Sequence, residues 1–193
     1  MAHVEAYQTV KQELFYGDST RLIDLSSKVN MVNVASQLRT SPRVVLGRKY
    51  PIITVTRIDY RLVCQQVLVD AETDTLYDNP RGIVVLRQTD SERTVSYEAV
   101  IAGIPEQAAA EGEIIGAVTI QPTGRINESM NLGEDLPAAL PAGNRLVVIR
   151  SGTGEYTIAG SSTQLATGVH VLPAAGDAAI TGDGFAISRT LVN

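Results

Sequence analysis

The strongest pattern in the chain is a run of β-branched and aromatic residues over 52–69, which predicts a strand. Its apolar phase slips between Val55 and Ile58, and this slip indicates a bulge, a bend or two faces used in turn. A crowded apolar stretch over 29–34 predicts another strand. Residues 36–51, which lie between the two, are polar and basic and hold two prolines and a glycine, so we expect a long excursion there.

A hairpin is predicted further along the chain. Ile83–Arg87 and Thr94–Gly103 are typical of strands, and the polar turn Gln88–Arg93 separates them. The segment Ile104–Gly112 has a proline at its start, three alanines in its middle and a glycine at its end, so it is the one helix that we expect. Strand-like alternation returns in Glu113–Gly124.

The remainder of the chain is rich in small residues. Residues 127–144 hold glycine, proline and alanine without a period, which predicts a linker or long loop. In 145–193, short apolar stretches alternate with Gly-, Ser- and Ala-rich turns, which predicts short strands at close spacing. The fold expected is mainly β, an antiparallel β-sandwich or barrel with one short helix. The domains expected are a β domain over 1–126, the linker over 127–144 and a small C-terminal β-rich module over 145–193.

The amino-acid composition excludes several classes of function. With 193 residues, 44% hydrophobic and 19% charged, the chain has enough apolar residues to bury a core. A net charge of −5, few aromatic residues and no tryptophan argue against a protein whose main task is to grip nucleic acid, although a conduit for DNA stays open. The longest apolar run, Ile114–Ile120, is far shorter than the roughly 18 residues of a membrane helix. The first twenty residues carry four charged residues and no long apolar stretch, so we expect no signal peptide.

Motifs for catalysis or cofactor binding are absent from the sequence. There is no Gly-x-Ser-x-Gly run, no three-glycine dinucleotide loop and no Gly-Lys-Ser/Thr phosphate cradle. His3 and His170 lie far apart in sequence, so no zinc site is expected. Cys64 lies in an apolar run and is expected to be a buried hydrophobic residue. We therefore expect no enzyme and no cofactor.

An acidic segment over 70–80 partly matches a calcium loop, because oxygens at alternate positions converge on a hard cation. Its sixth position is Thr75, where the loop needs glycine, and its twelfth is Arg81, where the loop needs glutamate. The pattern therefore argues against calcium, and the segment has room for one helical turn.

Charge is distributed unevenly along the chain. Between Asp24 and Asp59 there are six basic residues and no acidic one, whereas 70–78 carries four acids and no base. Residues 106–113 add three more acids without a base. Unlike surfaces on one chain can meet across neighbouring copies, and such a heterologous contact generates rings or filaments. The alternative is that these charges only solvate loops.

Four stretches in order carry a resemblance to a known family. Residues 16–30 combine a glycine turn, an Asp-Leu-Ser phrase and a strand, and the polar excursion 37–50 precedes another strand. Residues 93–104 and 113–126 are similar to the family's last two strands, and the second ends in a polar-x-Gly phrase. Over residues 14–126 this order resembles the tail tube proteins of long-tailed bacteriophages.

The resemblance implies hexameric rings that stack into a tube, with long loops joining successive rings and DNA passing through the lumen without specific binding. It also implies the tape measure and other tail proteins as partners, and a place in the virion tail after assembly in the host cytoplasm. Six copies carry about −30 per ring, and a negative lumen repels phosphates. Residues 127–193 lie outside the likeness and are expected as an added module.

Combined with the charge pattern, the resemblance yields candidates for contacts between subunits. The expected donors lie in the inter-ring loop and are Arg39, Arg43, Arg48 and Lys49. The expected acceptors are Asp70, Glu72 and Asp74. One alternative is a β-rich decoration or binding module, on a capsid surface or for carbohydrate, which would stay monomeric or form a small closed oligomer. Another is a hydrolase in which scattered carboxylates converge.

Overall fold

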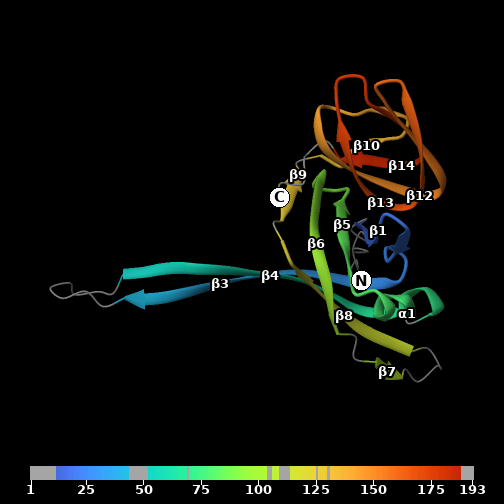
Figure 1. Ribbon diagram of the computed structural model, residues 1–193. Coiled ribbons are helices and arrows are strands. Elements are labelled where there is room, and N and C mark those ends of the chain that lie inside the picture. The colour runs from blue at the N-terminus through green and yellow to red at the C-terminus, as the bar shows by residue number, and fades with distance from the viewer. Residues whose placement is uncertain are drawn as a thin grey trace, which may run out of the picture. The chain divides into compact units, whose positions relative to one another are not determined.

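The computed structural model describes residues 12–43, 52–68, 70–103, 106–108, 114–124, 126–129 and 131–187. Antiparallel β-strands dominate it, and α1 (Ala71–Asp78) is the single helix of this described part (Figure 1). The expectation of a mainly β, antiparallel fold is therefore confirmed. The chain divides into two compact units: unit 1 comprises 1–28, 81–99 and 123–193, and unit 2 comprises 29–80 and 100–122. The domain boundaries expected from sequence stay a prediction.

The first sheet of unit 1 is built around the N-terminal strand. β1 (Gln12–Asp18) pairs with β2 (Arg21–Asp24) on one side and with β5 (Arg81–Gln88) on the other. β6 (Arg93–Gly103) lies next to β5 and also pairs with β9 (Asn127–Ser129). The β5–β6 hairpin predicted from alternation is thus confirmed.

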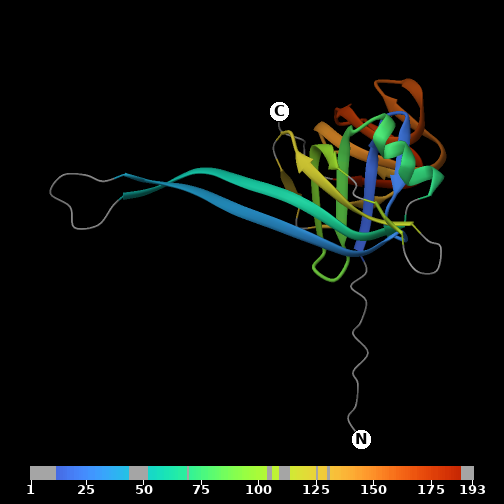
Figure 2. The ribbon, with the colours of Figure 1, turned by 90° about the horizontal axis from the view of Figure 1, so that it is seen from below.

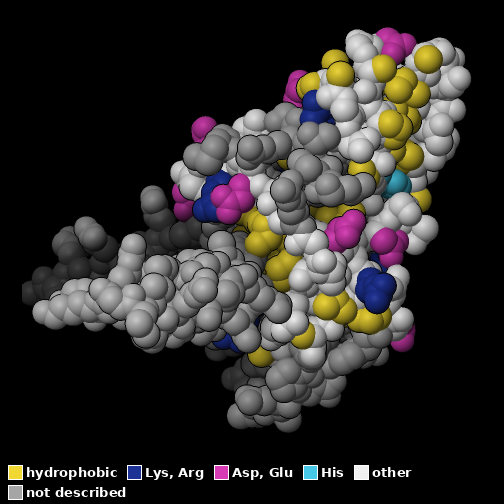
Figure 3. All heavy atoms as spheres, turned by 60° about the vertical axis from the view of Figure 1, so that its left-hand side comes forward, with side chains coloured by type: hydrophobic (Ala, Val, Ile, Leu, Met, Phe, Trp, Pro, Cys, Tyr) yellow, Lys and Arg dark blue, Asp and Glu magenta, His cyan; other side chains and the backbone are white. Residues whose placement is uncertain are grey.

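The second sheet of unit 1 has the order β10-β14-β12-β13, and β11 also pairs with β14. Its strands are β10 (Glu134–Asp135), β11 (Ala138–Ala139), β12 (Gly143–Ile158), β13 (Ser161–Ala174) and β14 (Ala179–Ile187). The expected linker 127–144 is therefore wrong in part, because its short segments add strands to the sheet edges. On the face drawn in Figure 3, few charged side chains lie over these C-terminal strands.

β12 is one long strand where the sequence predicted separate short ones. Its register shifts between Ile149 and Glu155, at a glycine-rich stretch interpreted as a turn. Gly152 has a φ of +68°, and a Cβ on Gly154 would lie 2.6 Å from the Cδ1 of Ile149. These glycines lie at a bulge inside the strand, because glycine readily adopts the positive φ at 152 and leaves room for the neighbours of 154.

Unit 2 places β8 (Ile114–Pro122) between the end of β6 and β4 (Ile52–Leu68), and β3 (Val29–Arg43) lies on the far side of β4. β7 (Glu106–Ala108) pairs with β8. The helix expected over 104–112 is therefore wrong where it is described, because the backbone of β7 pairs in a sheet. The helix lies instead at α1, where Asp70 supplies an N-terminal cap.

The strand predicted over 52–69 is confirmed as β4, and its phase slip corresponds to a bulge. Arg39 lies opposite Arg57 and Thr40 lies opposite Val55, so Thr56 is the additional residue. The polar excursion expected from residue 36 is wrong as far as residue 43, because β3 continues to Arg43. Residues 44–51 lie outside the described part.

The core of unit 2 contains Cys64, as expected from its apolar neighbours. Its side chain is buried with Leu62, Leu76, Val118 and Ile120, all of them fully inaccessible to solvent. Burial raises the pKa of the Cys64 thiol to about 12. This thiol is therefore protonated and inert at neutral pH.

Candidate assembly interface

The β3–β4 hairpin extends past the sheet to which it belongs. β3 pairs with β4 along its full length, whereas β4 pairs with β8 only over residues 62–68. Among the described residues, 35–43 of β3 and 52–61 of β4 therefore pair only with each other. Figures 1 and 2 show the two strands running side by side as a long ribbon. We call residues 35–43 and 52–61 the arm.

The arm is poorly supported by its own chain. A two-stranded hairpin is marginally stable at best in water, because it lacks a third strand or a packed layer to cover it. Each of its outer edges also presents backbone N–H and C=O groups that no neighbouring strand satisfies in the described residues. An element of this kind gains stability by binding to another surface.

The arm is also strongly basic. Its residues include four arginines, Arg39, Arg43, Arg57 and Arg61, and Asp59 is their single acid. Arg39 and Arg57 occupy directly opposite positions beside the bulge. Sequence reasoning did not select Arg57 as a contact, because its pairing with Arg39 depends on the register around the bulge.

The structure places part of the predicted contact set on the arm. Arg39 and Arg43 lie on β3, near and at its end. Arg48 and Lys49 lie outside the described residues. The expected acceptors Asp70, Glu72 and Asp74 lie together at the start of α1.

Asp70 has a structural task that the sequence did not reveal. The backbone N–H groups of Glu72 and Thr73 donate to Asp70 Oδ1 at 3.0 and 2.9 Å, and the N–H of Asp70 donates to Thr73 Oγ1 at 2.8 Å. This reciprocal capping box satisfies the N–H groups of the first turn. The segment interpreted as a partial calcium loop is therefore a capped helix.

α1 also has an electrostatic mismatch. It carries acids and no base in its last turn, and the exposed Asp78 lies at its C-terminal end. The C-terminus of a helix carries partial negative charge, which disfavours a carboxylate by about 0.3–1 kcal/mol. A cation supplied by another molecule would relieve this mismatch.

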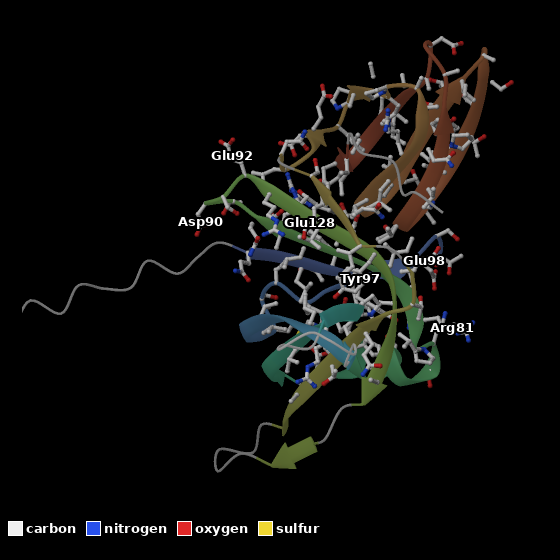
Figure 4. All side chains as sticks on the ribbon, turned by 90° about the vertical axis from the view of Figure 1, so that its left-hand side faces the viewer. Arg81, Asp90, Glu92, Tyr97, Glu98 and Glu128 are labelled. Atoms are coloured by element: carbon white, nitrogen blue, oxygen red, sulfur yellow. The ribbon has the colours of Figure 1, made fainter. Side chains whose placement is uncertain are left out.

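Other exposed groups lie on the β5–β6 hairpin of unit 1. Asp90 and Glu92 point away from its turn (Figure 4), and Arg93 forms an ion pair with Glu128 at 2.6 Å. At the other end of the hairpin, an open concavity of about 380 Å³ is lined by Arg81, Gly82, Ile83, Glu98, Ala99 and Thr123. Within the described residues, no cluster of three His, Cys, Asp or Glu is arranged to hold a metal. No helix there is long and apolar enough to span a membrane.

His170 and its surroundings show a structural histidine. The side chain is buried on β13, and its Nε2 lies 2.8 Å from the carbonyl oxygen of Ala166. A carbonyl oxygen can only accept, so Nε2 carries the hydrogen and donates to it, which gives this histidine a structural hydrogen bond.

No protein-family model matches the chain, and no curated protein matches it. Among solved structures, a chain from "Tail of empty GTA particle", with C6 symmetry, is 13% identical, with a TM-score of 0.50 over 65% of this chain and 99% of the other. The likeness is one of fold. A chain from the virion of a native gene transfer agent (GTA) particle is also 13% identical, with a TM-score of 0.48 over 60% of this chain and 95% of the other. The SPP1 Dit (gp 19.1) protein, described as a paradigm of the hub adsorption apparatus in phages that infect Gram-positive bacteria, is 11% identical. Its TM-score is 0.37 over 94% of this chain and 87% of the other.

Proposed function

We propose that this chain is a structural protein of a bacteriophage-type tail, in which six copies close into a ring and rings stack into a tube. DNA passes through the lumen without specific binding. The partners are further copies of the chain, the tape measure protein and other tail proteins. The protein is not an enzyme, needs no cofactor, and belongs to the virion tail after assembly in the host cytoplasm.

The observation that carries the proposal is the arm. It combines open strand edges, a basic sequence and two arginines in directly opposed positions. The arm would be stabilised by a surface that covers it and by negative charge, and a second copy of the chain supplies both. The acids at α1, namely Asp70, Glu72 and Asp74, are the acceptors that we propose on that copy, with Arg39, Arg43, Arg48 and Lys49 as donors.

The likeness in fold also supports a role in a tail. A solved chain with this fold comes from a tail with C6 symmetry, and 99% of that chain is covered. A contact between an arm and a different surface on the next copy is heterologous, so it repeats from copy to copy and builds rings or stacks. The net charge of −5 per copy suits a conduit from which DNA phosphates are repelled.

Negative-stain electron microscopy across a concentration and salt series, with light scattering alongside, tests the proposal. Purified protein is expected to form rings and hollow tubes that disappear as salt screens the charged contacts. The variant carrying Arg43→Glu and Arg48→Glu is expected to lose tube growth. Two single variants give a matched comparison: Arg43→Glu is expected to weaken tube growth, whereas Arg81→Glu, a charge reversal at an exposed residue of unit 1, is expected to assemble normally.

Three results would contradict the proposal in different ways. A small monodisperse particle at every concentration would favour the decoration or binding module. Rings that never stack would remove the tube and leave a ring-forming tail protein. Unchanged tubes in the Arg43→Glu/Arg48→Glu variant would show that these arginines do not bridge rings.

A further inference from the structure

The N-terminal and C-terminal parts of the chain share one core in unit 1. Phe15 of β1 and Val85 of β5 pack against residues of β12, β13 and β14, which are Leu146, Val148, Val169, Phe185 and Ile187. Every one of these side chains is at most 2% exposed. The rings of Phe15 and Phe185 have centroids 5.5 Å apart at a 50° tilt. The two sheets of unit 1 therefore pack face to face around apolar and aromatic surface.

Three charged side chains from three strands border this core. Arg87 Nη1 on β5 lies 2.6 Å from Glu13 Oε2 on β1, and the Nε–H of Arg87 donates to the carbonyl oxygen of Leu132 at 2.8 Å. Arg150 Nη2 on β12 lies 3.1 and 3.2 Å from the two carboxylate oxygens of Glu13. The Arg87 side chain is only 8% exposed, and those of Arg150 and Glu13 are 33% and 34% exposed.

Both arginines also contact the aromatic rings. The guanidinium carbon of Arg87 lies 4.0 Å from the centroid of Phe185, and that of Arg150 lies 5.1 Å from the same centroid and 5.6 Å from that of Phe15. A guanidinium at these distances is attracted by the ring face, more strongly where water is excluded. The charged groups and the rings therefore form one cluster across the two sheets.

Among the residues that the structure describes, the cluster has two cations and a single anion within 3.2 Å of them. The other carboxylate near it, Asp135, lies 3.8 Å from Arg87 Nη2 and is 82% exposed, so solvent screens it. Among the described residues, removing Glu13 would leave the two partly buried guanidinium groups next to each other, with only the solvent-screened Asp135 as counter-charge. Removing Arg150 would leave a one-to-one pair between Glu13 and Arg87. Breaking a buried charge pair from one side is strongly destabilising, so Glu13 is the more sensitive position.

We infer that Glu13, Arg87 and Arg150 form an ionic clasp that locks β12–β14 onto β1 and β5. Residues 131–187 are then a fixed half of unit 1 that opens together with β1 and β5, and they do not form a module that opens by itself. This inference concerns the single subunit, so it stands or falls independently of the proposed tail function.

The full chain with Glu13→Gln tests the clasp, because glutamine keeps the shape and removes the charge. Hydrogen exchange and urea unfolding are measured at a protein concentration where the subunit is monomeric. Amides of β1, β5, β12 and β14 are expected to exchange faster together, by roughly a hundredfold, and the urea midpoint is expected to fall. The control Glu128→Gln removes an exposed ion pair with Arg93 and is expected to change exchange less than about fivefold.

The double variant Glu13→Gln/Arg150→Gln decides the case where the single variant does not fold. The clasp predicts that the double variant is more stable than Glu13→Gln alone, because one of the two uncompensated cations is gone. Three outcomes would overturn the inference. These are a Glu13→Gln variant that behaves like Glu128→Gln, a double variant no more stable than Glu13→Gln, or β12–β14 amides that open while β1 and β5 stay protected.

Discussion

The β3–β4 hairpin and the β12–β13 hairpin have strands of similar length, 15 and 17 residues against 16 and 14. Their surroundings differ. β12 has β13 on one side and β14 on the other for most of its length, and its apolar face is buried in two clusters. β4 has a second neighbour only over residues 62–68. Strand length therefore does not decide whether a hairpin is stable by itself; the third strand and the buried face do.

The outer edges of the two hairpins differ in the same way. β13 is an edge strand that carries Pro173, which cannot donate a hydrogen bond to an added strand. At Gly168 it packs against the backbone of Asp18 and Ser19 in the β1–β2 turn. β3 has Pro42 only next to its end. The C-terminal hairpin is thus protected against strand addition, whereas the arm is open to it.

Hydrogen exchange is expected to show the largest difference between the two hairpins. In the monomer, arm amides are expected to exchange at least roughly a thousandfold faster than the paired amides of β12, which the proposed clasp ties to β1 and β5. Assembly is expected to slow exchange in the arm and leave β12 unchanged. Mass spectrometry on protein below and above the assembly concentration measures both. An arm already as protected as β12 in the monomer would remove the basis of the comparison.

The arm also shows where sequence reasoning reached its limit. A strand is recognised by alternation when one face is buried, and β4 near Leu62 and the β5–β6 hairpin both have such a face. Residues 36–43 of β3 are polar, with a proline, and belong to a two-stranded arm with no sheet to cover them, so nothing imposed alternation on their sequence. The local sequence therefore predicts a polar excursion there and no strand.

The candidate site was predictable to a similar degree. The basic and acidic segments were visible as charge runs, because charge is a property of composition. The capping role of Asp70 has a local signal, because Thr73 three residues later completes the box, but it has meaning only once the segment is recognised as a helix. The pairing of Arg57 depends on a bulge register, which local sequence does not contain. The strands of 127–144 depend on partners far along the chain, such as Ala186 opposite Glu134.

A substitution inside the sheet that contains the β12–β13 hairpin is expected to have the next largest effect. A Cβ on Gly184 of β14 would collide with the carbonyl oxygen of Val148 on β12, so the two strands would have to separate. We expect Gly184→Ala to lower the free energy of unfolding by about 3 kcal/mol or more. Gly176→Ala is the control, because a Cβ there meets nothing within 4 Å. Urea unfolding measures both, and equal midpoints would show that β12 and β14 tolerate the separation.

The smallest expected effect is on how the free energy of unfolding depends on pH, and it distinguishes the two units. Burial raises the pKa of Cys64 in unit 2 from 9.0 to about 12. Burial also raises that of Tyr16 in unit 1 from 10.0 to about 12, where Arg21 lowers it and Asp18 raises it. Each group is held neutral by folding, so its contribution is complete below the unfolded pKa and falls as pH rises toward the folded pKa. The slope for each group approaches about 1.4 kcal/mol per pH unit.

Because the two unfolded values differ, the thiol of Cys64 begins to lower stability near pH 9 and the phenol of Tyr16 only near pH 10. Cys64→Ala is therefore expected to flatten the decline between pH 9 and 10, and Tyr16→Phe to flatten it only above pH 10. Urea unfolding in half-unit pH steps measures both variants against the unsubstituted chain. If Cys64→Ala left the slope between pH 9 and 10 unchanged, the thiol would titrate near its ordinary pKa. The part of the β3–β4 hairpin next to the arm, where Cys64 lies opposite Val32, would then admit water, unlike the core of unit 1.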